Sequence, residues 1–208
     1  GIGTDIGGSI RGPSAFCGIY GYKPTSYVLP MKGMLKAPFS AELNVICAIG
    51  PMCRTLRDVE FCTSVLLNAK PHLGDPRLIP LPWTGLKTQL AGPRRLKIGI
   101  IENDGFIEPQ PPVKRAVAWA RKLLSDPKYS DILEIKEFKP YGAAEAWSKI
   151  RRMYWPDGGE GPKAAITASG EPIYPLTTWI LKEAEAGGMQ NSTDVAYMRQ
   201  ERDNFRIE

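Results

Sequence analysis

Hydrophobic residues recur at helical spacing in several segments of the chain. Over residues 55–68, Thr55 is placed to cap a helix, with Asp58 three residues later in a weaker version of the capping box. Over 111–124, two prolines open a run whose apolar residues fall on one helical face. The same periodicity predicts further helices over 143–154, 176–186 and 194–206.

Two segments instead alternate between apolar and polar positions, which is typical of strands. They cover residues 95–101 and 132–138, with the helix over 111–124 between them. A strand, a helix and a second strand at this spacing predict a βαβ unit, and therefore a parallel or mixed sheet covered by helices. The apolar run 43–49 predicts one more, buried strand that ends at Gly50-Pro51.

Glycine and proline are abundant, at 21 and 19 residues, and they follow no period. They predict turns over residues 1–25, irregular chain over 27–38, an extended connection over 72–93 and a loop over 156–175. The expected fold class is α/β, with a mixed β-sheet flanked by helices. Scattered aromatic residues are interpreted as core: Phe106, Trp147, Tyr154, Trp155 and Trp179.

Composition places the chain among ordinary globular proteins, with 43% hydrophobic and 24% charged residues. The net charge of +5 comes from basic residues scattered in doublets, which does not predict nucleic-acid binding. No apolar run approaches the roughly 18 residues of a membrane-spanning helix. The four cysteines form no CxxC pair, so we expect free, buried thiols rather than disulfides or a zinc site, and a reducing, cytoplasmic setting.

The candidate chemistry lies in the opening stretch, GIGTDIGGSIRGPSAFCGIYGYKPT. Ser9 follows two glycines, which allow backbone N–H groups to point into one concavity and let a substrate approach the main chain. Such a loop could stabilise the oxyanion formed when a serine attacks a carbonyl group. Thr4 and Asp5 can hydrogen-bond the turn, and Arg11 can pair with Asp5.

Two plainer interpretations stand beside this one. The glycines could form only a tight turn, or they could cradle a phosphate group. The dinucleotide pattern GxGxxG, the P-loop and the hydrolase elbow GxSxG are all absent. The single histidine, His72, lies in a Pro-rich connection and is interpreted as a surface residue rather than a general base. Spacing alone leaves a structural turn and a catalytic loop equally open.

The same stretch resembles the signature of the amidase signature family, serine hydrolases that cleave carboxamide C–N bonds. The likeness continues around Gly50-Pro51-Met52, at 96–99 and 110–113, and at Asp157-Gly158-Gly159, which is similar to the fungal acetamidase and fatty-acid amide hydrolase branch. The signature positions that match are Gly1, Gly3, Thr4, Asp5, Gly7, Gly8, Ser9, Ile10, Arg11, Pro13, Phe16, Cys17, Gly18, Gly21, Lys23, Pro24 and Thr25.

The resemblance implies that Ser9 is the acyl-enzyme nucleophile. It implies an oxyanion hole formed by the backbone N–H groups of four consecutive residues, with a supporting set beside them. The oxyanion donors are Ile6, Gly7, Gly8 and Ser9, and the supporting residues are Thr4, Asp5 and Arg11. It implies no metal and no organic cofactor, and a small-molecule amide as substrate. For the scattered aromatic residues it adds an alternative to the core, namely the lining of an acyl pocket.

Family members use a Ser–cis-Ser–Lys triad whose bridging serine and lysine precede the signature. We therefore expect residues 1–208 to be the central part of a single amidase domain, truncated at both ends and inactive by itself. Two alternatives remain: a non-catalytic fragment that binds a ligand or partner, and a phosphate-binding Gly-rich loop protein. The sequence leaves the oligomeric state and the amide that is cut undetermined.

Overall fold

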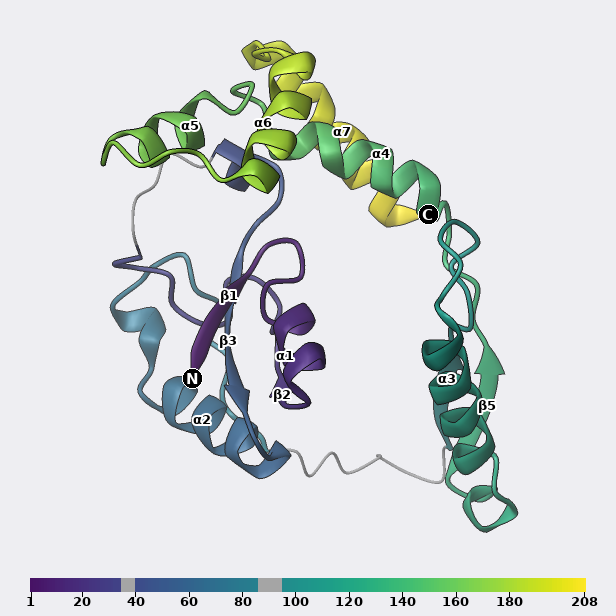
Figure 1. The fold of residues 1–208 in the computed structure, drawn as a ribbon. Coiled ribbons are helices and arrows are strands. Elements are labelled where there is room, and N and C mark those ends of the chain that lie inside the picture. Colours follow the sequence, from purple (N-terminus) through teal and green to yellow (C-terminus); the bar gives the residue numbers. More distant parts are fainter. Residues whose placement is uncertain (35–39, 86–94) are drawn as a thin grey trace. The chain divides into compact units, whose positions relative to one another are not determined.

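The computed structural model describes residues 1–34, 40–85 and 95–208 (Figure 1). The chain divides into two compact units. The first consists of Gly1–Lys87 and Arg151–Arg202, and the second of Thr88–Ile150 and Asp203–Glu208. Helices and β-sheets occur together and both parallel and antiparallel pairing are present, so the α/β class is confirmed.

The first unit contains a three-stranded antiparallel sheet in the order β1-β3-β2. β1 (Ile2–Asp5) pairs with the first part of β3 (Ala48–Cys53), and β2 (Tyr20–Gly21) pairs with its end. Helix α2 (Leu56–Asn68) packs against β3, as Figure 1 shows. The predicted cap of this helix is confirmed, because the Thr55 hydroxyl accepts the N–H of Asp58 at 3.1 Å.

The predicted strand over 43–49 is wrong in position. Residues 40–43 form a short 3-10 helix, η1 (Ser40–Leu43), and the strand runs from Ala48 through Gly50-Pro51 to Cys53. Proline is tolerated inside this strand because Pro51 stands where the pairing changes from β1 to β2. Its carbonyl accepts the N–H of Tyr22 at 3.0 Å. Gly-Pro therefore marks a change of partner, and not the end of the strand.

The prediction that residues 1–25 form only turns is also wrong. They contain β1, β2 and the short helix α1 (Arg11–Cys17), which ends at Gly18 in the left-handed conformation. Pro13 lies in the first turn of α1, where its missing N–H would have had no helical partner.

Residues 156–175 contain a helix that the sequence did not predict, α5 (Glu160–Thr167). Pro162 again lies in the first turn of its helix. The Asp157 carboxylate accepts the N–H groups of Gly159 and Gly161, both at 3.0 Å, and thereby satisfies two donors at the start of the helix. The predicted helices on either side are confirmed as α4 (Ala143–Tyr154), α6 (Pro175–Gly187) and α7 (Ser192–Ile207).

The second unit contains the predicted βαβ arrangement. β4 (Leu96–Ile100) and β5 (Leu133–Glu137) are parallel and in contact, with Leu96 opposite Leu133. They are joined through α3 (Pro111–Leu124) and a short 3-10 helix, η3 (Pro127–Tyr129), and α3 contacts β5. The boundaries of α3 are those that the sequence predicts.

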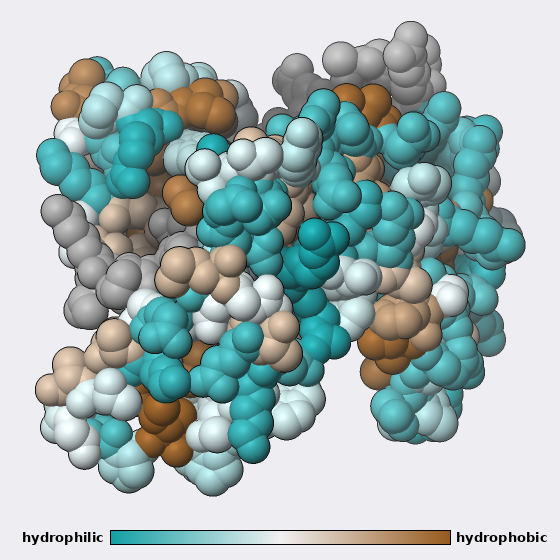
Figure 2. All heavy atoms as spheres, turned by 90° about the horizontal axis from the view of Figure 1, so that it is seen from above, coloured by the Kyte–Doolittle hydropathy of each residue, from teal (hydrophilic) through white to brown (hydrophobic). Residues whose placement is uncertain are grey.

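The irregular character predicted for 27–38 and 72–93 is confirmed where the structure describes it, apart from η2 (Pro71–Leu73), while residues 35–38 and 86–93 lie outside the described part. The core interpretation is wrong for Phe106, Trp147 and Trp179, whose exposed fractions are 45–59%. Figure 2 shows one face on which hydrophilic residues dominate and hydrophobic residues form small separate groups. Among the described helices, none has the length and apolar character to cross a bilayer.

Candidate active site

The Gly-rich stretch forms a loop over residues 6–10 that connects the end of β1 to the start of α1. Its entrance is fixed by the sheet, since Asp5 lies opposite Ala48 in the β1–β3 register. Its exit is fixed by Ile10, whose side chain is completely buried. Ser9 lies between these two anchors and is exposed, so its hydroxyl is carried by a short loop that is held at both ends.

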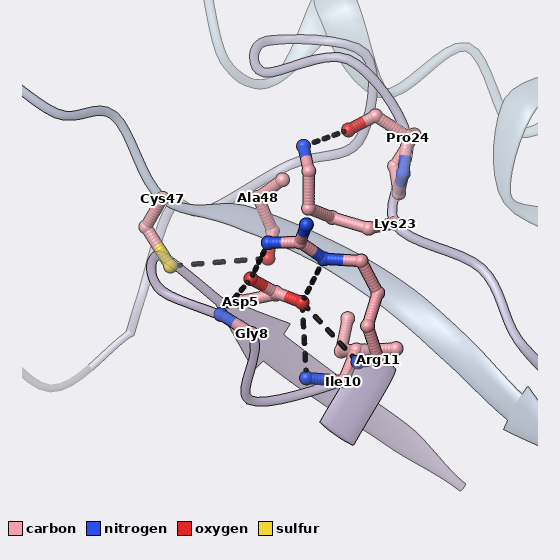
Figure 3. A network of polar contacts seen from close by, with 8 residues as sticks. All are labelled: Asp5, Gly8, Ile10, Arg11, Lys23, Pro24, Cys47 and Ala48. Carbon is pink, nitrogen blue, oxygen red and sulfur yellow. Dashed lines mark hydrogen bonds and ion pairs between the residues drawn. The ribbon is translucent and has the colours of Figure 1, made fainter. Parts of the chain in front are cut away.

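Asp5 organises the loop from inside (Figure 3). The residue is only 1% exposed, and its carboxylate accepts the backbone N–H groups of Gly8 at 2.7 Å, Ile10 at 3.2 Å and Arg11 at 3.3 Å. A buried carboxylate is costly unless its oxygens are hydrogen-bonded, and here both oxygens are. The chain therefore wraps around the side chain of Asp5.

Arg11 completes this arrangement, as the sequence predicts. Its guanidinium group donates from Nε to Oδ2 and from Nη2 to Oδ1 of Asp5, both at 3.0 Å. This fork, with the three backbone N–H bonds in addition, holds the pKa of the Asp5 carboxyl well below its usual range although burial opposes it. The same pairing raises the pKa of Arg11. The two residues thus form a charged clamp across the loop.

The clamp divides the backbone donors of the loop into two groups. The N–H groups of Gly8, Ile10 and Arg11 serve Asp5. For Ile6, Gly7 and Ser9, the structure records no N–H hydrogen bond within the residues it describes. Of the four expected oxyanion donors, Gly8 is therefore engaged internally. Thr4, expected to support the loop, is exposed in β1 opposite Ile49.

The position of Asp5 also bears on the phosphate alternative. A phosphate cradle needs several convergent N–H groups and an available positive charge. In this loop three N–H groups converge on a carboxylate that is already part of the chain, and that carboxylate pairs with Arg11. The geometry disfavours a phosphate at the centre of the loop, because an internal anion occupies it.

One residue beside the loop, Tyr154, was interpreted from the sequence as a core or pocket-lining aromatic residue and was not connected with the loop. The hydroxyl group of Tyr154, at the end of α4, packs against Gly7, so that a Cβ atom at Gly7 would lie 2.5 Å from the hydroxyl oxygen. Burial raises the pKa of the Tyr154 phenol, and the charge of Asp5 adds to this effect. No local pattern brings Tyr154 to Gly7, since the two residues are far apart in the sequence and meet only in the folded unit.

The structure also bears on metal ligands and on the cysteines. Within the described ranges, no cluster of three or more His, Cys, Asp or Glu residues could hold a metal ion. The four cysteines form no disulfide within the described residues, as predicted, but only Cys47 is buried, and Cys17 is exposed.

Comparison with known proteins places this loop in a family. A model of the family described as Amidase matches residues 1–204. The chain belongs to the amidase family. It is 37% identical over 183 residues to a family relative from Schizosaccharomyces pombe, covering 88% of this chain and 33% of the relative. It is 33% identical over 179 residues to the acetamidase of Aspergillus oryzae, covering 84% of this chain and 32% of that protein.

A solved structure supports the same assignment at the level of the fold. The fatty acid amide hydrolase structure superposes with a TM-score of 0.86 and 29% identity, covering all of this chain and 35% of the other. The chain thus spans about a third of the length of the relatives it matches. The resemblance to amidases that the sequence indicated is thus confirmed for the family and for the fold.

Proposed function

We propose that this chain carries the nucleophile of an amidase. The main observation behind this proposal is the geometry of the loop. Ser9 is exposed, and the Asp5–Arg11 clamp holds the loop in shape. In the same loop, the N–H groups of Ile6 and Gly7 have no recorded partner among the described residues. A nucleophile next to available backbone donors is the arrangement that acyl transfer needs. Membership of the amidase family supports this assignment.

In the proposed reaction, the Ser9 hydroxyl oxygen attacks the carbonyl carbon of an amide and its proton passes to a base. The resulting oxyanion receives hydrogen bonds from N–H groups of the loop, including those of Ile6, Gly7 and Ser9. The C–N bond then breaks, and ammonia or an amine leaves with a proton. Water attacks the acyl-enzyme and releases a carboxylic acid and free Ser9. The reaction requires no metal ion and no organic cofactor.

The proposed base is the lysine of a Ser–cis-Ser–Lys triad, acting through a bridging serine. Both residues would lie in parts of the gene product outside these 208 residues. We propose accordingly that both compact units belong to one amidase domain, and that residues 1–208 alone show no turnover. The substrate class is a small-molecule carboxylic amide, as the names of the acetamidase and fatty acid amide hydrolase relatives indicate for those proteins.

The test is hydrolysis of simple amides by the intact gene product, with released ammonia as the readout. Ser9→Ala is expected to abolish release, and a fluorophosphonate that traps activated serines is expected to label Ser9. Ser169→Ala is the matched control, because Ser169 is also exposed and its hydroxyl donates to the backbone carbonyl of Ile166 in α5. Full ammonia release by Ser9→Ala would refute the proposal. Phosphate binding that survives Ser9→Ala, with no ammonia released by the wild type, would favour the Gly-rich phosphate loop instead.

A further inference from the structure

Tyr154 contacts the loop over residues 6–10 at Gly7. Asp5 binds the N–H of Gly8, and Ile10 anchors the start of α1 in the core, but the peptide between Ile6 and Gly7 has no recorded hydrogen bond from its N–H among the described residues. The Tyr154 hydroxyl packs against this segment. A Cβ atom at Gly7 would lie 2.5 Å from the hydroxyl oxygen and 3.4 Å from the ring carbon that bears it.

The backbone around Tyr154 is itself fixed on both sides. Before it, the carbonyl of Met153 accepts the side-chain amide of Asn44 at 3.3 Å, and both residues are at most 3% exposed. After it, the carbonyl of Pro156 accepts the N–H of Gln190 at 2.8 Å. Tyr154 is thus presented to the loop by a segment bound to other parts of the same unit, so its hydroxyl can act as a rigid stop.

We propose that Tyr154 is a positioning residue for the reaction proposed above: its hydroxyl fixes Gly7, and with it the N–H groups that would receive the oxyanion. The inference rests on the proposed function. Tyr154 makes no bond to the reacting atoms in this account. It acts through Gly7, by preventing the Ile6–Gly7 peptide from moving away from Ser9.

The contact can be tested by substitution at Gly7, because Gly7 does not have a positive φ and its backbone conformation does not require glycine. An alanine there is compatible with the backbone, and its methyl group meets only the Tyr154 side chain within 4 Å. In the intact gene product, Gly7→Ala should therefore displace the loop and lower kcat for amide hydrolysis by about 100-fold, the effect of a misplacement near 1 Å. Tyr154→Phe removes the obstructing oxygen, so the double variant should recover about tenfold of the lost kcat.

The matched control is Gly8→Ala. Gly8 has a φ of 123°, which an alanine side chain strains, yet a Cβ atom there would meet nothing within 4 Å. Gly8→Ala should lose activity for a reason that Tyr154 does not share, so Tyr154→Phe should not restore it. Rescue that is specific to Gly7 separates a direct contact from a general gain in stability.

Tyr154→Phe alone should lower kcat by about threefold to tenfold with KM unchanged, because a looser loop weakens transition-state binding more than substrate binding. If Gly7→Ala does not fold, this variant decides, and an unchanged kcat overturns the inference. The inference is also overturned if the double variant regains the wild-type melting temperature but not the lost kcat. A wild-type protein that hydrolyses amides and is labelled at Ser9, but shows no Gly7-specific rescue, overturns only the role of Tyr154. A wild type with neither property overturns the proposed function itself.

Discussion

Replacing Asp5 by asparagine tests the central claim about the loop, because the change keeps the shape of the side chain and removes its charge. Asp5 accepts five hydrogen bonds, three from backbone N–H groups and two from the Arg11 guanidinium. An amide has one oxygen, so its NH₂ group must face donors. If the NH₂ group replaces Oδ1, the N–H of Gly8 loses its acceptor; if it replaces Oδ2, those of Ile10 and Arg11 do.

The expected cost follows from these lost partners. A buried donor left unpaired costs about 1–3 kcal/mol. The Arg11 side chain is 57% exposed and can be hydrated, so its loss of the carboxylate adds little. The less costly orientation leaves the N–H of Gly8 unpaired, so Asp5→Asn should lower the free energy of unfolding by about 1–3 kcal/mol, a substantial part of the 5–15 kcal/mol typical of a domain.

Urea unfolding of the intact gene product at pH 7 measures this loss, and the rate of fluorophosphonate labelling at Ser9 measures the effect on the loop. Asp75→Asn is the matched control: Asp75 is also buried and paired with an arginine, Arg77, but accepts only one recorded backbone N–H. The control should lose less stability and keep the wild-type labelling rate. A loss below about 1 kcal/mol for Asp5→Asn, or unchanged labelling, would refute the reasoning.

Three further outcomes follow from other contacts. Because the pKa of Asp5 is lowered in the folded state, its stabilisation is complete above the unfolded value of about 3.9 and is lost as pH falls through the folded value. The fall in unfolding free energy between about pH 5 and 2 should accordingly be shallower in Asp5→Asn than in wild type, and equal slopes would contradict this. Thr55→Ala should cost about 1 kcal/mol in urea unfolding through the lost cap of α2, with Ser9 labelling unchanged. Gly50→Ala should prevent soluble expression because its Cβ would collide with the Tyr22 carbonyl, whereas Gly12→Ala, with free space around it, should express normally; soluble, folded Gly50→Ala would contradict the packing.

The sequence predicted long elements well, because their signals are local. The capped helix after Thr55, the helix from Pro111 to Leu124 and the parallel strands beside it all carry their periodicity within one segment. The charged pair of Asp5 and Arg11 was also predictable, since six positions around a glycine turn allow the side chains to meet.

The two helices that the sequence missed share one cause. Both α1 and α5 have Gly-Pro at their second and third positions, Gly12-Pro13 and Gly161-Pro162, which favours a turn when considered alone. Each tolerates proline because it lies in the first turn, and each has an aspartate that accepts N–H groups there, Asp5 or Asp157. The helix start is thus decided by a carboxylate outside the helix.

The remaining misses depend on distant partners. β1 has four residues, three of them glycine or small and polar, and becomes a strand only by pairing with β3, more than forty residues later. The contact between Tyr154 and Gly7 likewise joins the end of α4 to the first loop. Periodicity and turn chemistry act over a few residues, so neither contact leaves a signal in its own segment.

The carboxylate of Asp5 takes the place that a bound anion would otherwise fill in shaping the turn between β1 and α1. The loop consequently holds its form in the absence of any ligand. Donors that are already in place need not reorient when negative charge develops nearby, so little reorganisation energy opposes the charge. Because Asp5 supplies an anion within the turn itself, the loop donors are oriented when the chain folds, and no later step has to orient them.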